Sequence, residues 1–339
     1  MHIVITGSSG SIAEALVDVV LSSTTHTLTL VDHKPPPEDK KVSDPRIKYE
    51  TRDLREYKDY AEVVKGADGL IHLAAFAQPY LASPDVVHNS NVTLSFNALQ
   101  AASEAGIRHV VIASSVNAIG GAYSQERNLR YHYFPVDEKH PSFVDEPYAL
   151  SNLRYHYFPV DEKHPSFVDE PYALSKSIAE LQAEAFAHEK HPSFVDEPYA
   201  LSKSIAELQA EAFARAYPNM SISSLRFHHV VPEKKRMSGE ESLKVNSFDL
   251  WGWIECPAAG RACLLALEVE WTGAEVIYIV GEEHCVVPGE GTTEELARKY
   301  FPEAVLRKKF GPQEGFFDCS KAERLLGWKH SGGRQPRRE

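Results

Sequence analysis

The sequence predicts an α/β fold in which a parallel β-sheet carries helices on both faces and a smaller lobe follows at the C-terminal end. Strand-like apolar runs alternate with helical segments through the first half of the 339 residues. A glycine-rich turn follows the first of these runs, and the alternation gives way to longer loops after Val231. Alternation of this kind indicates right-handed crossovers between parallel strands.

The elements follow one another in a regular order. The first strand is "HIVIT", and "SIAEALVDVVLS" after it has apolar residues at helical spacing. "TLTLVD", "RIKYE", "GLIHLAA" and "HVVIASS" repeat the strand pattern, and "NVTLSFNALQAASEAG" is the helix between the last two. "SISSLRF" at 221–227 is the next expected strand.

Composition excludes several classes of protein. A formal net charge of −12 argues against a nucleic-acid partner, which needs a clustered basic surface. No apolar run approaches the roughly 18 residues that span a bilayer, so we expect no membrane association. The four cysteines form no CxxC pair, which indicates reduced thiols and a cytoplasmic location. We also expect no metal site. Residues 329–339 read as a disordered tail.

The turn "TGSSGSIA" carries the first chemical signal. Gly7, Gly10 and Ala13 have the spacing of a dinucleotide-binding turn, directly between a strand and a helix. Glycine lets a pyrophosphate approach the backbone, and the helix amides face its negative charge. Asp32 ends the second strand, where a carboxylate accepts bonds from ribose hydroxyls and repels a 2′-phosphate. This favours NAD over NADP; a plain glycine-rich turn is the alternative.

These residues, together with "RDLRE", "HLAA", "ASSVNAIGG" and "YALSK", resemble the extended short-chain dehydrogenase/reductases, the NAD-dependent epimerase/dehydratase family. The resemblance implies a Rossmann-type doubly wound sheet and a possible homodimer. It implies an NAD-binding domain at 1–230 with a duplicated insert at about 138–188, and a substrate-binding lobe at 231–328. It also implies the following cofactor-binding residues: Gly7, Ser9, Gly10, Ser11, Ile12, Asp32, Asp53, Leu54, Leu73, Ala74, Ala75, Asn91 and Lys203.

Hydride transfer at a carbinol carbon needs a proton-transferring group at the oxygen. A tyrosine serves when a nearby cation lowers its pKa, and a lysine four residues later on a helix lies on the same face. A serine at the end of a neighbouring strand then donates to the substrate oxygen. Ser115 fits that role and Ser114 is next to it, although a strand-end hydroxyl that caps a loop is the plain alternative.

The tyrosine motif is present three times, because "EKHPSFVDEPYALS" begins at Glu138, Glu162 and Glu189. Residues 128–151 recur at 152–175 and residues 162–187 recur at 189–214, so removing 51 residues leaves an ordinary 288-residue chain. Each copy is one loop and part of one helix, which is too little for a self-supporting repeat. We interpret the repeat as a recent duplication or a gene-model error.

The three tyrosines are not equivalent. Tyr148 has Asn152 where the lysine is needed, whereas Tyr172 has Lys176 and Tyr199 has Lys203. Choosing Tyr199 sends its helix straight into the strand at 221–227 and leaves one long bulge before it, which costs little because loop entropy grows with the logarithm of length. Choosing Tyr172 places insertions at two junctions. The sequence therefore favours Tyr199 with Lys203, and Tyr172 with Lys176 is the alternate copy.

The substrate is less sharply defined. His229 stands where the family often has an asparagine, and the acidic pair of dehydratases is replaced by Val116 and Asn117. "VPEKKRMS" resembles uronate dehydrogenases, which implies that Arg236 grips a carboxylate with its bidentate guanidinium; a solvated arginine is the alternative. Trp251, Trp253 and Trp328 either wall a sugar site or pack in the core, and core packing is the better expectation.

The overall expectation is an NAD-dependent oxidoreductase that acts on a sugar or another small polar hydroxyl compound. An epimerase that retains its NAD is the nearest alternative. A catalytically inactive dinucleotide-binding sensor is an alternative from a different class.

Overall fold

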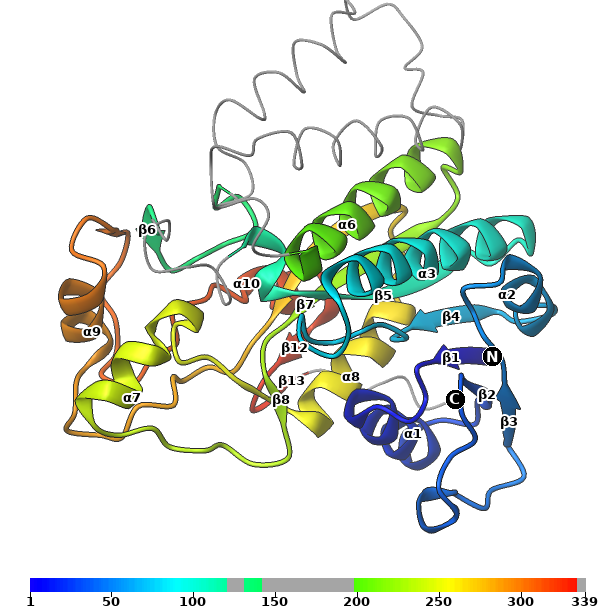
Figure 1. Cartoon of the computed structure of the whole chain (residues 1–339), viewed down its shortest axis with the longest axis horizontal. Helices are drawn as coiled ribbons and strands as arrows, with labels where there is room; N and C mark the ends of the chain where they lie inside the picture. Colours follow the sequence, from blue (N-terminus) through cyan, green and yellow to red (C-terminus); the bar gives the residue numbers. More distant parts are fainter. Residues whose placement is uncertain (121–130, 142–197, 334–339) are drawn as a thin grey trace, which may run out of the picture.

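The computed structural model describes residues 1–120, 131–141 and 198–333. Its centre is a seven-stranded parallel sheet in the order β10-β7-β5-β4-β1-β2-β3 (Figure 1). The strands are β1 (His2–Thr6), β2 (Thr27–Asp32), β3 (Ile47–Thr51), β4 (Gly69–His72), β5 (His109–Ser115), β7 (Ser221–Phe227) and β10 (Gly273–Ile279). The predicted fold class is confirmed.

The strand order changes direction between β1 and β4, which lie side by side although β2 and β3 separate them in the sequence. In open sheets of this type, loops leave such a pair of strands in opposite directions and open a crevice at the carboxyl ends. The glycine-rich turn follows β1, and "LAA" follows β4 at the same edge. The topology alone therefore directs a ligand to this edge.

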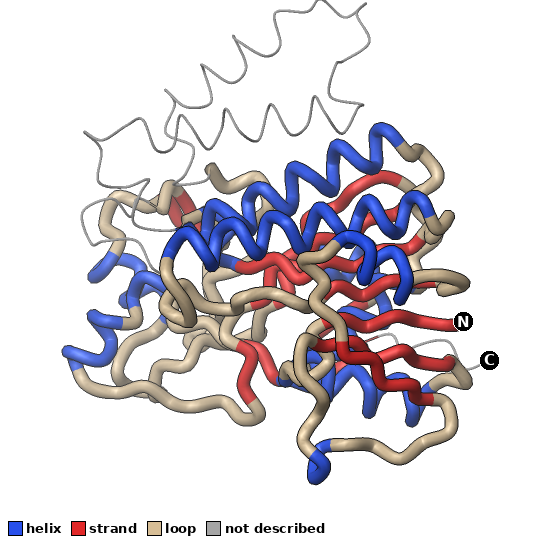
Figure 2. The backbone as a smooth tube through the Cα atoms, turned by 45° about the vertical axis from the view of Figure 1, so that its right-hand side comes forward, coloured by secondary structure: helices blue, strands red, loops and turns tan. Residues whose placement is uncertain are grey.

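Helices cover both faces of the sheet, and Figure 2 shows the two layers on either side of the strands. On one face lie α1 (Ser11–Ser23), α8 (Cys256–Leu267) and α10 (Ser320–Leu326). On the other lie α2 (Tyr57–Val63), α3 (Pro84–Glu104) and α6 (Pro198–Ala216), with α3 and α6 side by side. Each layer buries an apolar cluster against the sheet, and this burial is the main stabilising contribution.

Gly260 allows α8 to approach α1 closely. A Cβ atom at this position would lie 2.8 Å from the backbone nitrogen of Leu16 and 2.9 Å from the carbonyl carbon of Ala15. Such contacts are shorter than packed atoms tolerate, so the two helices touch backbone to backbone here. Because α1 begins directly after the glycine-rich turn, this contact also fixes the helix end that faces the crevice.

The chain beyond residue 231 contributes elements to two parts of the structure. β10 and α8 complete the central sheet and its cover. The remaining elements include α7 (Glu240–Val245), α9 (Thr293–Tyr300) and a 3₁₀ turn, η4 (Ser247–Asp249), and their apolar residues form a third cluster. The domain boundary at residue 230 stays a prediction, since the central sheet contains strands from both sides of this residue.

Aromatic residues dominate this third cluster. Trp251 is fully buried and its indole nitrogen donates to the carbonyl of Leu243 at 2.9 Å. Trp253 lies in the same cluster, while Trp328 packs under the sheet with α8. All three tryptophans therefore serve as core residues, the reading that the sequence favoured. In the described part of the chain, no helix has the length and apolarity needed to cross a membrane.

Candidate active site

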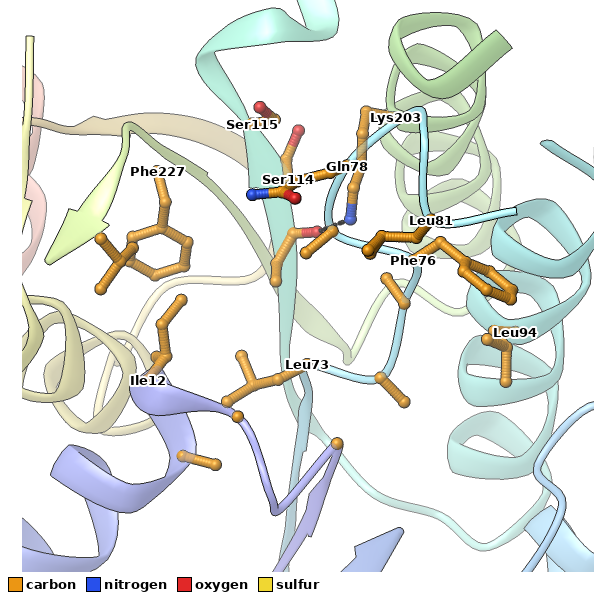
Figure 3. Close-up of a pocket in the computed structure, with 18 of the residues that line it drawn as sticks. Ile12, Leu73, Phe76, Gln78, Leu81, Leu94, Ser114, Ser115, Lys203 and Phe227 are labelled. Atoms are coloured by element: carbon orange, nitrogen blue, oxygen red, sulfur yellow. Dashed lines mark hydrogen bonds between the residues drawn. The ribbon is translucent and has the colours of Figure 1, made fainter. Parts of the chain in front are cut away.

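A cavity of about 860 Å³ lies at the carboxyl ends of the central strands. Figure 3 shows Ile12 and Leu73 at one end, and Ser114, Ser115 and Lys203 gathered at the other. The volume falls within the range of small-molecule and cofactor pockets, about 300–1,000 Å³. The predicted site residues that line it are Gly7, Gly10, Ser11, Ile12, Asp32, Asp53, Leu54, Leu73, Ala74, Ala75, Ser115, Tyr199, Lys203 and His229.

The glycine-rich turn forms the floor of one end. Gly7 has a φ of +68°, a conformation that favours glycine, and a Cβ atom there would lie 2.7 Å from the backbone nitrogen of Ala74. The amide of Gly10 donates to the carbonyl of Gly7 at 3.0 Å and closes the turn. Gly10 is also the N-cap of α1 and provides no side-chain cap. Amides at this helix end therefore face the cavity without a capping side chain, as an anion requires.

Asp32 lies at the end of β2, on the same side of the cavity. One carboxylate oxygen accepts a hydrogen bond from the backbone nitrogen of Ser9 at 2.9 Å, and the other accepts from the backbone nitrogen of His33 at 2.7 Å. Ser9 itself does not line the cavity. Its amide instead holds the carboxylate against the turn, so that Asp32 is oriented before any ligand binds.

Two arginines that the sequence analysis did not single out line the same end, Arg52 and Arg55. Arg55 forms a bidentate pair with Asp53, with distances of 2.9 Å and 2.6 Å, and this pairing lowers the pKa of the Asp53 carboxyl. The pair follows β3 and borders the cavity where Leu54 also lies. The guanidinium of Arg52 pairs instead with Glu50 at 3.2 Å. The stretch "RDLRE" therefore places two arginines and one paired carboxylate at this end of the cavity.

The opposite end brings together the three residues predicted to act in catalysis. Ser115 ends β5, while Tyr199 and Lys203 lie one turn apart on α6. The Nζ atom of Lys203 lies 5.8 Å from the centroid of the Tyr199 ring and donates to the carbonyl of Ala113 at 2.7 Å. The Oγ atom of Ser115 accepts from the backbone nitrogen of Asn117 at 3.1 Å. All three side chains are buried or nearly so.

Burial controls the ionisation of this end of the cavity. It lowers the pKa of Lys203 to about 8, against the opposing effect of the carboxylate of Glu207. Burial, together with the positive charge of Lys203, lowers the pKa of His72 to about 3, so this imidazole is neutral. Its Nδ1 atom lies 2.9 Å from the hydroxyl oxygen of Thr6 and 3.0 Å from that of Tyr60. Lys203 is thus a cation whose proton is held less firmly than usual.

Residues Tyr148, Tyr172 and Lys176 lie outside the described residues. Of the third copy of the repeat, the structure describes the part from Pro198 onward, where α6 begins and leads to β7. The choice between Tyr199 and Tyr172 stays a prediction.

His229 lines the cavity next to the end of β7. Its Nε2 atom lies 3.0 Å from a carboxylate oxygen of Asp249, and this hydrogen bond raises the pKa of the imidazole. Asp249 is held in turn by the backbone nitrogen of Trp251 at 3.0 Å. Leu250 and Trp251 both have positive φ, an uncommon strain that a buried environment maintains.

The structure does not bring Arg236 or Asn91 to the cavity. Arg236 donates to the carbonyl of Val286 at 3.2 Å and to the side chain of Gln313 at 3.1 Å, so its side chain is held by other residues of the C-terminal lobe. Asn91 exchanges hydrogen bonds with the backbone of Phe76, at 2.8 Å and 3.1 Å. It braces the loop after β4 rather than lining the site. The expected roles of both residues, in gripping a carboxylate and in bordering a cofactor, have no support in this geometry.

A known family model matches part of the chain. The model of the NAD dependent epimerase/dehydratase family matches residues 3–153. No curated protein matches the chain. Among solved structures, the UDP-glucose 4-epimerase of Thermotoga maritima with UDP-glucose is 18% identical with a TM-score of 0.59, covering 97% of this chain and 94% of that one.

Two further structures share the fold. MoeE5 in complex with UDP-glucose and NAD is 18% identical with a TM-score of 0.58, covering 99% of this chain and 95% of its own. The uronate dehydrogenase of Agrobacterium tumefaciens is 15% identical with a TM-score of 0.56, covering 97% and 83%. At these identities the likeness concerns the fold. Together with the family match, it confirms that this chain resembles the extended short-chain dehydrogenase/reductases of the NAD-dependent epimerase/dehydratase family.

Proposed function

We propose that the chain is an NAD-dependent oxidoreductase that transfers hydride at a carbinol carbon of a sugar or another small polar hydroxyl compound. One observation carries the proposal. A single cavity has a glycine-rich turn and Asp32 at one end, and Ser115, Tyr199 and Lys203 at the other. Such a reaction needs the cofactor and the proton-transferring side chains beside the substrate in one cavity.

The residues present fit a dinucleotide. A side chain at Gly7 would fill the cradle over Ala74, so the cradle is kept open by glycine. The amides at the start of α1 suit a pyrophosphate. The oriented carboxylate of Asp32 suits two ribose hydroxyls and opposes a 2′-phosphate, which favours NAD over NADP. Among the described residues, Leu54 and Leu73 supply apolar surface between these polar groups.

The proposed chemistry assigns one task to each side chain. NAD, when bound, supplies the acceptor for hydride. Tyr199 takes the proton of the substrate hydroxyl, and the cation of Lys203 favours the phenolate form that makes this transfer feasible. Ser115 donates to the substrate oxygen from the end of β5 and holds it beside the phenol.

The substrate half of the cavity combines two surfaces. Gln78, Asn117 and His229 offer hydrogen bonds, which suits a compound with several hydroxyl groups. The apolar surface comes from Phe76, Ala77, Leu81, Val116, Phe227, Val230 and Val231. A sugar presents both kinds of surface, since its ring faces are less polar than its edges. His229, oriented by Asp249, is the proposed hydroxyl-binding residue nearest to β7.

The decisive experiment measures NADH formation across a panel of aldoses, uronic acids and simple secondary alcohols, with NADP in parallel. Tyr199→Phe should abolish turnover and leave NAD binding in place, because the ring keeps its packing and loses only the hydroxyl. Tyr172→Phe is the matched control, since it makes the same change in the other copy with a lysine. Loss of turnover only in Tyr172→Phe would overturn the assignment to Tyr199.

The same panel separates the alternatives. Interconversion of two sugars without net NADH would identify an epimerase that retains its cofactor. NAD binding without turnover of any compound would favour a sensor. The oligomeric state, for which we propose a homodimer, is measured by sedimentation.

A further inference from the structure

The helix that carries Tyr199 and Lys203 also carries a buried carboxylate one turn further on, Glu207. Residues four apart on a helix lie on the same face, so Glu207 continues the row formed by the tyrosine and the lysine. Its side chain is 10% exposed. A carboxylate so far from water needs partners, and its partners link it to the proposed site.

Within the described residues, the hydrogen bonds that this carboxylate accepts come from two strands of the sheet. Glu207 accepts a hydrogen bond from the hydroxyl of Ser114 on β5. It also accepts two from the guanidinium of Arg226 on β7, at 2.9 Å and 2.7 Å. Arg226 donates in turn to the hydroxyl of Tyr278 on β10 at 3.0 Å. The pair therefore ties α6 to three neighbouring strands in a low-dielectric environment, where such bonds are strong.

The contact with Ser114 falls at a critical place on β5. On one side of it, the carbonyl of Ala113 accepts the hydrogen bond from Lys203 at 2.7 Å. On the other side stands Ser115. Lys203 and Glu207 thus bind successive residues at the end of the strand, and together they fix how this strand end sits against α6.

We propose that Glu207 is a positioning residue that holds the Ser115 end of β5 against α6 and keeps Lys203 in its cationic form. The proposal rests on the function proposed above, in which that cation supports Tyr199. It goes further in naming the group that sustains the cation within a buried site.

The electrostatic surroundings agree with this role. Burial lowers the pKa of Lys203, and among the described residues Glu207 is the group whose charge raises it again. The other titratable groups around Lys203 and Glu207 differ from Glu207 in charge or in partner. They are His72 on β4, which is neutral, Glu211 and Tyr199 on α6, Arg226 on β7, which is paired with Glu207, and Tyr278 on β10, whose pKa is raised to about 12 by burial.

The test is Glu207→Gln, which keeps the shape of the side chain and removes its charge. The pKa of Lys203 is measured from the ¹³Cε chemical shift in lysine-labelled protein, without substrate or cofactor. We expect it to fall by about one pH unit, since a nearby opposite charge shifts a pKa by this order. In the pH profile of kcat/KM, the loss of activity that follows deprotonation of Lys203 should occur at a correspondingly lower pH.

Glu211→Gln is the matched control. Glu211 lies one turn further along α6, its side chain is 52% exposed, and it pairs with Arg215 at 3.9 Å. This variant should leave both the titration of Lys203 and the pH profile unchanged. A purely structural role for Glu207 predicts that its variant also leaves the titration unchanged.

Glu207→Gln leaves Arg226 buried without its counter-charge, so the double variant Glu207→Gln/Arg226→Gln is tested as well. An unchanged Lys203 titration in Glu207→Gln relative to the parent, or in the double variant relative to Arg226→Gln, overturns the proposal. A lowered pKa in a protein that turns over no substrate upholds the effect of Glu207 on Lys203 while it refutes the proposed function. The NMR readout therefore separates the two failures.

Discussion

Replacing Lys203 by methionine should make the protein more stable at neutral pH while it abolishes turnover. The two side chains are similar in length and volume, so packing against Ala113 is largely kept. What changes is the cost of a buried charge. Burial lowers the pKa of Lys203 from 10.5 to about 8, a difference of about 2.5 pH units. At about 1.4 kcal/mol per pH unit, the charged form costs the folded protein about 3 kcal/mol.

Part of this gain is offset. The carbonyl of Ala113 loses the hydrogen bond that it accepts from Lys203. A buried carbonyl without a partner costs about 1 kcal/mol or slightly more. The net expectation at pH 7 is therefore a gain of about 2 kcal/mol in the free energy of unfolding.

The pH dependence of the free energy of unfolding gives a sharper test than the stability gain at pH 7 alone. Below about pH 8 the lysine is charged in both the folded and the unfolded chain, so the full cost is present. Between about pH 8 and 10.5 the folded protein releases its proton first, and the stability of the parent rises with pH. At pH 9.5 the advantage of Lys203→Met should accordingly shrink to about 0 kcal/mol.

The assay is urea unfolding at pH 7 and pH 9.5 without cofactor, with tryptophan fluorescence as the probe. The exposed Lys235 provides the control: Lys235→Met removes a solvated charge and should follow the parent at both pH values. A Lys203→Met variant that is less stable than the parent at pH 7 would refute the reasoning. It would mean that the hydrogen bond and the nearby carboxylate outweigh the desolvation of the ammonium group.

Three further substitutions test the geometry. Gly7→Ala should abolish NAD binding in calorimetry and lower the free energy of unfolding by at least about 1–2 kcal/mol, because φ there is +68°. Normal NAD binding would contradict the proposal that Gly7 keeps the cofactor cradle open. Gly260→Ala should cost about 1–3 kcal/mol in thermal unfolding, since its Cβ would press on the backbone of Leu16; an unchanged Tm would show that the helices separate freely. Asp249→Asn should lower the pKa of His229 in an NMR titration, because the carboxylate raises it; an unchanged pKa would exclude the pairing.

Much of the fold was readable from local patterns. The predicted strands "HIVIT", "TLTLVD", "HVVIASS" and "SISSLRF" coincide with β1, β2, β5 and β7. "GLIHLAA" was too long, because β4 ends at His72 where the chain turns over the cavity. The seventh strand, β10, was not identified. Its apolar run stands among longer loops, without the alternation that marks the first half.

The candidate site was predictable where one segment carries the signal. The glycine-rich turn, Asp32 and the tyrosine-lysine spacing each follow from a short motif, and the structure gathers them around one cavity. Glu207, Arg226 and Asp249 were missed, because their meaning depends on partners in other elements. The role of Arg236, which a local resemblance implied, stays a prediction, since its side chain contacts Val286 and Gln313 and does not line the cavity.

The division of the sheet between the two halves of the chain affects how the protein is made. A ribosome-bound chain that ends before residue 256 has β1 and β4 but lacks α8, the helix that covers them beside α1. Its apolar sheet face is therefore open to solvent and to other nascent chains during synthesis. The glycine-rich turn cannot be braced until α8 arrives. Folding of the cofactor half is thus expected to finish only after most of the chain has been translated, with chaperones protecting the uncovered face until then.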